Sequence, residues 1–384
     1  MESADVVIIG AGIVGSSIAW NLTESGCHKV LLIERESQQG KGSTGKSMGG
    51  VRAQFSTPES IRMSLYSIPV FRDFEQIVGH SSGYRGQGYL FVATDGRDLA
   101  YLSTNVERQV SLGVRVELLT PADVIRMVPQ LRPDDITGGS FCPTDGFVDP
   151  YSVMIGFTAR ALERGARLWR GVEVSGIRVD MQGVAGVETT NGFVSSRAVV
   201  NAAGPWAASV AKLAGVDIPV QPLRRMLAPT EPFDQIARSA PMTVDMSTGF
   251  HFRPEGLGIL MAWNDPHETY GFNTNFDPEF IEKILTRAVS RVPCLESVEV
   301  NARRGWAGLY EMTPDHHPIL GEAPNVPGFW LANGFSGHGV MHSPATGRIL
   351  ADLILKGSCS LVDTGLFSLN RFAEGRVIEE TAVL

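Results

Sequence analysis

Short apolar runs alternate with a helical pattern over the first 34 residues of the chain. Val6-Val7-Ile8-Ile9 is a run of strand-forming residues, and Gly10-Ala11-Gly12-Ile13-Val14-Gly15 follows it directly. The apolar stretch Ser16–Leu22 is compatible with a helix, and a second apolar run, Val30-Leu31-Leu32-Ile33, ends on Glu34. The pattern predicts a strand, a glycine turn, a helix and a second strand.

An acid about twenty residues after the glycine turn completes the dinucleotide-binding fingerprint. Gly10 permits the tight turn, Gly12 lets the backbone approach a pyrophosphate, and Gly15 allows the helix to pack closely on the strand. The helix N-terminus at Ile13-Val14 offers free N–H groups and a partial positive charge to the phosphates. Glu34 is expected to accept hydrogen bonds from an adenosine ribose.

A polar, glycine-rich segment, Gly40–Gly50, follows the second strand on the side where doubly wound sheets bind ligands. We expect it to wrap the cofactor, with Ser43 and Thr44 as phosphate or ribityl contacts. The cofactor-binding positions predicted in this region are Arg35, Ser43, Thr44, Lys46, Ser47, Met48 and Gly49. Arg52 is either a solvated surface charge or a guanidinium that binds a substrate carboxylate.

The middle of the chain mixes helical and strand patterns. It predicts helices over 58–78, 96–112 and 151–165, strands over 89–92, 172–177 and 184–189, and a proline-rich connection around 121–143 that crosses between domains. Ala198–Asn201 is a buried strand that ends in small residues before a helix. Small residues there allow a ligand to approach, so we expect a second contact with the cofactor at Ala203, Gly204 and Trp206. Val174 is a further predicted cofactor-binding position.

Residues 221–305 have the pattern of antiparallel sheet with one helix over 281–292. His251 and Arg253 share one face of their strand. That face is either solvent-exposed or part of a substrate pocket, and His251 is a candidate catalytic residue.

The last eighty residues contain a second glycine-rich turn. The strand Phe329–Asn333 is followed by Gly334-Phe335-Ser336-Gly337-His338-Gly339, and a helix is predicted from about Ser343, with Pro344 in its first turn. Such a turn presents positive backbone groups to a ring that becomes anionic on reduction, such as a flavin. The cofactor-binding positions predicted here are Gly308, Gly334, Gly337, His338, Gly339, Val340 and Met341.

Composition narrows the class of protein. The 384 residues carry 33 basic and 41 acidic side chains, a net charge of −8, which gives no general attraction to nucleic acid or anionic membranes. Cys27, Cys142, Cys294 and Cys359 are far apart, so we expect neither a disulfide framework nor a metal site. No stretch is long and apolar enough for a membrane span. A cytoplasmic protein of two packed domains is the simplest expectation.

Taken together in their order, the motifs resemble the D-amino-acid oxidase superfamily of FAD enzymes. They are the fingerprint with Glu34, the segment Gly49–Phe55, Cys142–Gly146, Asn201–Trp206, Tyr310 with Thr313–Asp315, and Gly334–Gly339. The branch most similar to the chain contains sarcosine oxidase, dimethylglycine dehydrogenase and the catalytic subunit of bacterial proline dehydrogenases.

The resemblance implies an α/β fold with a Rossmann-type FAD-binding domain and an α+β substrate domain on a mixed or antiparallel sheet. We assign residues 1–80, 146–220 and 306–384 to the first domain and residues 81–145 and 221–305 to the second. By resemblance, Arg52 binds the substrate carboxylate and Tyr310 contacts the substrate.

The implied reaction is oxidation of a small amino acid or N-methyl amino acid by hydride transfer to flavin N5, with hydrolysis of the resulting imine. Gly308 stands where monomeric sarcosine oxidase has its flavin-linked cysteine, so we expect non-covalent FAD. Met341 stands where that enzyme has a lysine that activates dioxygen, which favours another electron acceptor. A glycine or D-amino-acid oxidase-like enzyme, and a flavin-bound subunit with no small substrate of its own, are the alternatives. The sequence does not identify the amine, the acceptor or a partner subunit.

Overall fold

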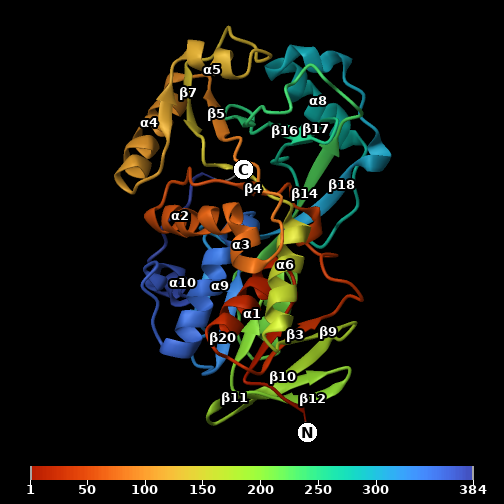
Figure 1. Ribbon diagram of the computed structural model, residues 1–384, viewed down its shortest axis with the longest axis vertical. Helices are drawn as coiled ribbons and strands as arrows, with labels where there is room; N and C mark the ends of the chain where they lie inside the picture. The colour runs from red at the N-terminus through yellow and green to blue at the C-terminus, as the bar shows by residue number, and fades with distance from the viewer. Residues whose placement is uncertain (1, 383–384) are drawn as a thin grey trace.

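A computed structural model describes residues 2–382, and two large sheets organise it (Figure 1). The first is six-stranded and parallel except at one edge, where β19 runs antiparallel to β20. Its strands, in spatial order, are β19 (Ile319–Glu322), β20 (Phe329–Asn333), β13 (Val199–Asn201), β2 (Val6–Ile9), β3 (Val30–Glu34) and β9 (Arg167–Arg170).

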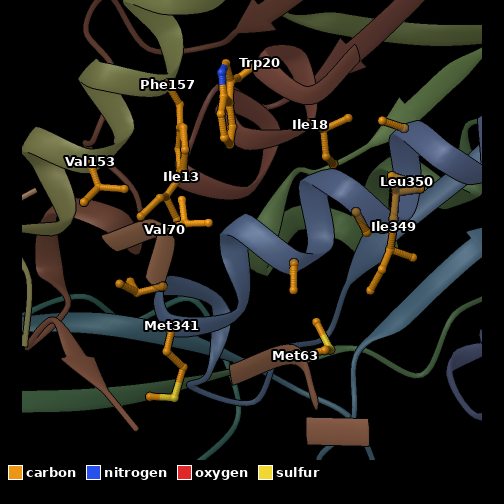
Figure 2. Packing of buried hydrophobic residues seen from close by; sticks show 14 of the residues in the cluster. Ile13, Ile18, Trp20, Met63, Val70, Val153, Phe157, Met341, Ile349 and Leu350 are labelled. Atoms are coloured by element: carbon orange, nitrogen blue, oxygen red, sulfur yellow. The ribbon is translucent and has the colours of Figure 1, made fainter. Parts of the chain in front are cut away.

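The six-stranded sheet is buried on both faces, which explains the uninterrupted apolar runs of its strands. Val6 and Ile8 belong to a core shared with four helices, and Figure 2 shows part of that core. These helices are α1 (Ile13–Glu24), α2 (Pro58–Arg72), α6 (Pro150–Glu163) and α9 (Gly339–Lys356).

Val7 and Ile9 point to the opposite face of that sheet, into a second core. This core is closed by α7 (Ala207–Lys212) and a small sheet of β1 (Glu2–Ser3), β12 (Gly192–Ser195), β11 (Gly183–Thr189) and β10 (Val174–Asp180). The short helices α3 (Phe74–Val78) and α10 (Asn370–Ala373) and the β4–β8 pair (Gly50–Val51, Gly146–Phe147) complete this part of the fold.

The second large sheet is eight-stranded and antiparallel apart from the parallel β15–β5 pair. Phe280, Ile284 and Val124 of the helices α8 (Glu279–Arg291) and α5 (Pro121–Met127) belong to its core, and α4 (Gly96–Ser111) contacts β5 and β7. The strands, in spatial order, are β18 (Trp306–Met312), β14 (Gln221–Pro229), β17 (Gly258–Ala262), β16 (His251–Glu255), β15 (Met242–Asp245), β5 (Tyr89–Ala93), β7 (Gly138–Cys142) and β6 (Glu117–Leu119).

The predicted fold class is confirmed by the Rossmann-type sheet and the mixed second sheet. The domain boundaries stay a prediction. Strand β18, which the prediction assigns to the first domain, hydrogen-bonds along β14 in the eight-stranded sheet.

Three local predictions were wrong. The helix predicted over 58–78 is broken into α2 and α3 at Asp73, and the proline-rich connection around 121–143 contains α5 and β7. Helix α9 begins at Gly339 and carries Pro344 in its interior. Proline removes the N–H that would reach the carbonyl of Val340. The Ser343 hydroxyl donates to that carbonyl instead (2.8 Å), so the carbonyl keeps a hydrogen-bond partner.

The C-terminal segment returns to the start of α2. The Glu380 carboxylate, which is fully buried, accepts hydrogen bonds from the backbone N–H of Ser56 (2.8 Å) and Thr57 (3.1 Å) and from both hydroxyls. These groups stand at the N-terminal end of a helix, where a carboxylate is stabilised. Burial acts to raise the pKa of Glu380, but the hydrogen bonds from Ser56 and Thr57 outweigh it and leave the pKa lowered.

The lowered pKa of Glu380 predicts a contribution to stability that depends on pH. A carboxyl whose pKa falls on folding stabilises the folded state above its unfolded pKa, near 4.5, and loses this effect as pH falls through the folded pKa. Glu380→Gln is therefore expected to cost about 1–3 kcal/mol at neutral pH, and the cost should shrink on acidification. Urea unfolding of both proteins from about pH 7 to pH 3 measures this.

The matched control is Glu379→Gln, since the side chain of Glu379 is 62% exposed. It should change the free energy of unfolding by less than about 0.5 kcal/mol. A cost for Glu380→Gln that stays constant down to the lowest pH would contradict the assignment.

Candidate functional site

A cavity of about 410 Å³ lies between the carboxyl ends of β2, β3 and β13 and one face of the eight-stranded sheet. This size is within the range of cofactor and ligand sites. Most of the predicted cofactor positions line it, together with Tyr310 and His251. They are Gly10, Gly12, Ile13, Val14, Glu34, Arg35, Ser43, Thr44, Lys46, Ser47, Met48, Val174, Ala203, Gly204, Trp206, Gly308, Gly337, Gly339 and Val340.

The remaining predicted positions lie behind this lining. Gly15, Gly49, Gly334, His338 and Met341 are not among the lining residues. Met341 belongs to α9 and lies in the hydrophobic cluster that Figure 2 shows, where it is 7% exposed. Their contacts with a cofactor stay a prediction.

The N-terminal glycine turn has the geometry that the fingerprint requires. Gly10 has φ +100°, and a Cβ there would lie 2.4 Å from the carbonyl oxygen of Ala202. A Cβ on Gly15 would lie 2.0 Å from the carbonyl oxygen of Gly10. Any side chain at either position would therefore displace the turn that opens α1.

The Glu34 carboxylate is fixed at the end of β3. It accepts hydrogen bonds from the backbone N–H of Ala11 (3.1 Å) and Glu36 (2.9 Å). Beside it, the Arg35 guanidinium lies 4.5 Å from the ring of Trp206, which stacks on Phe272 at 5.9 Å. These planar groups surround the end of the cavity where the fingerprint predicts the adenosine.

The loop at 40–48 connects the two large sheets. The Thr44 hydroxyl accepts from the backbone N–H of Ile13 at the start of α1 (3.0 Å), and the Ser43 hydroxyl donates to the carbonyl of Leu309 in β18 (2.7 Å). The indole N–H of Trp306 donates to the carbonyl of Lys46 (3.0 Å). The loop is thus held at the start of α1 and at β18, and it forms one wall of the cavity.

The C-terminal glycine turn packs directly on Tyr310. Gly337 has φ +96°, and a Cβ there would lie 2.4 Å from the Tyr310 ring. The half-buried carboxylate of Glu311 accepts from the backbone N–H of Gly334 (3.0 Å), which fixes the first residue of the turn. Burial raises the pKa of Glu311 to about 7, although backbone hydrogen bonds from Gly334 and Phe335 oppose the rise.

One face of the eight-stranded sheet lines the other end of the cavity. Pairing places His251, Ala262 and Leu227 in one row across β16, β17 and β14. Arg225 lies two residues before Leu227 in β14, so it shares this face. Arg225 pairs with Gly308 of β18, and Tyr310 follows Gly308 by two residues, so Tyr310 lies on the same face.

The two polar rings on this face are neutral near pH 7. Burial lowers the pKa of His251 to about 4, and burial raises the pKa of Tyr310. His251 Nδ1 lies 3.0 Å from the carbonyl oxygen of Gly249, so it carries the proton and leaves Nε2 as an acceptor. His251 and Arg253 are buried, so the solvent-exposed alternative was wrong.

Arg52 is fully buried, at 1% exposure, and is not among the residues that line the cavity. Its guanidinium lies over the Phe55 ring and donates to the backbone carbonyls of Gln54 and Ala382. Nη2 is also 3.3 Å from Nε2 of His338. The solvated alternative was therefore wrong, and binding of a substrate carboxylate by Arg52 stays a prediction.

The prediction missed Arg225, Glu311 and Phe272, all of which line the cavity. The available signal for Arg225 was a pair of adjacent arginines in a strand, one of which must face the core.

The chain shows no helix long and apolar enough to cross a membrane within residues 2–382.

Comparisons with known proteins place this geometry in context. A family model described as DAO, FAD dependent oxidoreductase, matches residues 5–353. FAD-dependent oxidoreductase domain-containing protein 1 of Xenopus laevis is 32% identical, over 97% of this chain and 83% of that protein.

Two further relatives have names that specify a substrate. Mitochondrial sarcosine dehydrogenase of Homo sapiens is 29% identical over 93% of this chain, which spans 40% of that longer protein. The crystal structure of L-proline dehydrogenase from P. horikoshii superposes with a TM-score of 0.91 at 30% identity, covering 97% of this chain and 99% of that one.

Proposed function

Because the chain belongs to the DAO family of FAD-dependent oxidoreductases, we propose that it oxidises the C–N bond of a small amino acid or N-methyl amino acid, such as sarcosine or proline. The observation that carries the proposal is the continuous cavity. It joins the glycine turns suited to FAD to the sheet face of Arg225, His251 and Tyr310. The names of the sarcosine and L-proline dehydrogenases support the same substrate class.

When bound in the cavity, FAD would supply the redox chemistry as the hydride acceptor. The residues of the chain hold and orient the substrate. Because His251 is neutral, its Nε2 can accept a hydrogen bond from the substrate amine. Removal of the amine from water lowers its pKa and favours the form without the extra proton. The imine product is then hydrolysed by water.

We also infer that the electrons pass to a redox partner in preference to dioxygen. The residue after Ser-Gly-His-Gly-Val is the uncharged, buried Met341, which gives no positive charge to stabilise reduced oxygen. Gly308 of β18, which pairs with Arg225 of β14, offers no thiol for a covalent flavin link.

An amine panel tests the proposal. The purified yellow protein is mixed anaerobically with sarcosine, dimethylglycine, L-proline, glycine or D-alanine, and flavin bleaching is followed before and after addition of a dye acceptor or dioxygen. We expect sarcosine or L-proline to bleach the flavin fastest, and the dye to restore its colour faster than dioxygen does. Acid precipitation should leave the flavin in solution, as expected for non-covalent FAD.

Each other outcome has a defined meaning. Rapid peroxide formation with glycine or D-alanine favours the oxidase alternative. A flavin that no amine bleaches favours a subunit without its own substrate. A colourless protein that takes up no FAD on reconstitution contradicts the proposal.

A further inference from the structure

Arg225 of β14 is a cation with no acidic partner at the substrate end of the cavity. Among residues 2–382, no carboxylate lies within 4.0 Å of its guanidinium. Its Nε is shielded from solvent and has no hydrogen-bond partner in the described part of the chain. Within the described residues, its one hydrogen bond runs from Nη1 to the carbonyl oxygen of Arg224 (3.2 Å).

The adjacent Arg224 shows the contrast. It points to the opposite face of β14, where its Nε donates to Glu268 (2.7 Å) and its Nη1 to the carbonyl of Asn275 (2.8 Å). Among the described residues, the same strand therefore carries one arginine in contact with a carboxylate and one without such a contact. Arg225 is half-buried, and leaving its shielded Nε–H without a partner is unfavourable, which points to a ligand that supplies an acceptor and the missing negative charge.

In the part of the chain that the structure describes, no carboxylate contacts Arg225 directly, and the acids whose charge acts on it, Glu268 and Asp265, are paired with Arg224 and Lys283. The Tyr310 ring centre lies 5.3 Å from its guanidinium carbon, and His251 shares the same sheet face. Both rings are neutral near pH 7, as their shifted pKa values show.

Arg52, the other candidate, already donates to two backbone carbonyls. Arg253, which shares the strand face of His251, donates to the carbonyls of Met48 and Pro254 and pairs with Glu255. Within residues 2–382, Arg225 is thus the arginine on this face without a carboxylate partner.

We propose that Arg225 binds the substrate carboxylate through the free N–H groups of its guanidinium, an inference that rests on the proposed function. A carboxylate fits two parallel N–H donors. His251 Nε2 and the Tyr310 hydroxyl are then left for the amine. The site therefore selects amino acids that carry a carboxylate over amines that lack one.

Binding of an unreactive analogue tests the proposal without turnover. Methoxyacetate has the shape of sarcosine with oxygen in place of nitrogen, and methoxyacetamide lacks its charge. Each is titrated into the FAD-loaded protein, and the dissociation constant is read from the flavin absorbance. In Arg225→Met, methoxyacetate should bind at least ~100-fold more weakly, with methoxyacetamide unchanged within about twofold. Arg225→Lys should restore part of the affinity, because it keeps the charge and loses the paired donors.

The matched control is Arg224→Met, which removes an arginine from the same strand but from the opposite face. It should leave the affinity for methoxyacetate within about twofold of the original. Melting temperatures of the FAD-loaded variants show whether each is folded. Arg225→Met should melt no lower than the original protein, because it removes an unpaired, shielded charge.

Two results separate this proposal from the proposed function. If sarcosine or L-proline bleaches the flavin of Arg225→Met with an unchanged KM, the carboxylate is bound elsewhere and the proposal is overturned, while the proposed function stands. If no amine bleaches the original protein but methoxyacetate binds and Arg225→Met abolishes its binding, the carboxylate site stands and the proposed function fails.

Discussion

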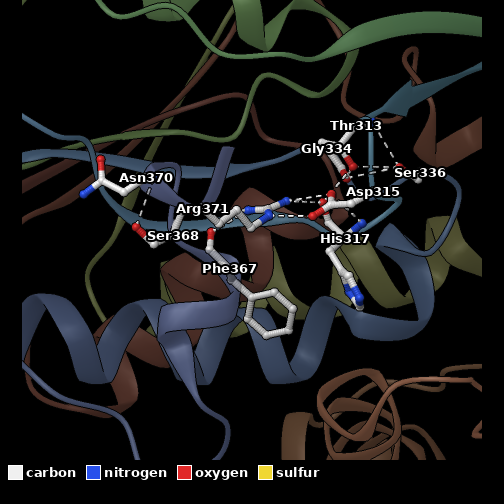
Figure 3. Close-up of polar contacts among 9 residues, drawn as sticks. All are labelled: Thr313, Asp315, His317, Gly334, Ser336, Phe367, Ser368, Asn370 and Arg371. Atoms are coloured by element: carbon white, nitrogen blue, oxygen red, sulfur yellow. Dashed lines mark hydrogen bonds and ion pairs between the residues drawn. The ribbon is translucent and has the colours of Figure 1, made fainter. Parts of the chain in front are cut away.

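Replacing Arg371 with leucine is expected to lower the free energy of unfolding by about 3–5 kcal/mol. Arg371 and Asp315 are each 1% exposed and form a two-pronged ion pair, with Nε–Oδ2 at 2.7 Å and Nη2–Oδ1 at 2.9 Å (Figure 3). Nη2 also donates to the carbonyl of His317 (3.0 Å). The substitution leaves the Asp315 carboxylate buried without its cation, which costs far more than the loss of an exposed pair.

Urea unfolding of the FAD-loaded protein measures this cost. The control is Arg376→Leu, because Arg376 pairs with Glu374 nearby and both side chains are about half exposed. That substitution should cost less than about 1 kcal/mol. The double variant Asp315→Leu with Arg371→Leu should recover part of the stability, since no charge then stays buried alone. Equal costs for the buried and the exposed arginine would refute the prediction.

Gly10→Ala is expected to abolish tight FAD binding and to destabilise the protein by about 2–5 kcal/mol. Two effects add at this position. The backbone has φ +100°, which an L-residue adopts only with strain, and the new Cβ would lie 2.4 Å from the carbonyl oxygen of Ala202. The turn must move away from β13, and the N–H groups that open α1 would move with it. The flavin content after gel filtration and the melting temperature are the measurements.

Gly26→Ala is the matched control for the backbone strain alone. Gly26 has φ +90°, but a Cβ there would meet nothing within 4 Å. This substitution should cost about 1–2 kcal/mol and leave the flavin content unchanged. Retention of FAD by Gly10→Ala would show that the turn does not bind the pyrophosphate.

The parts of the fold that could be predicted are those determined by local sequence. The apolar runs of β2 and β3, the glycine turn at Gly10 and the acid at Glu34 lie within one continuous segment, so their arrangement follows from spacing. The pairing of β14 with β18, or of β5 with β15, depends on contacts between residues far apart in the chain. Hydrophobic pattern alone does not specify such partners.

The candidate site was predictable to the same extent. The glycine-rich segments predicted the cavity, because glycine at the end of a strand allows a tight turn and the close approach of a ligand. Arg225 and Glu311 could not be assigned, since an arginine in a strand is equally compatible with an ion pair, as Arg224 shows. The start of α9 was predicted wrongly because Pro344 was placed in the first turn. The hydrogen bond from the Ser343 hydroxyl, which replaces the one that proline cannot make, cannot be inferred from the position of the proline alone.

The loop at 40–48 has a consequence for how the protein melts. Its side chains and backbone are joined both to the start of α1 and to β18, so neither large sheet can open without releasing it. Thermal unfolding of the two sheets should therefore be cooperative, and nucleotide occupancy should raise the temperature at which both disorder together.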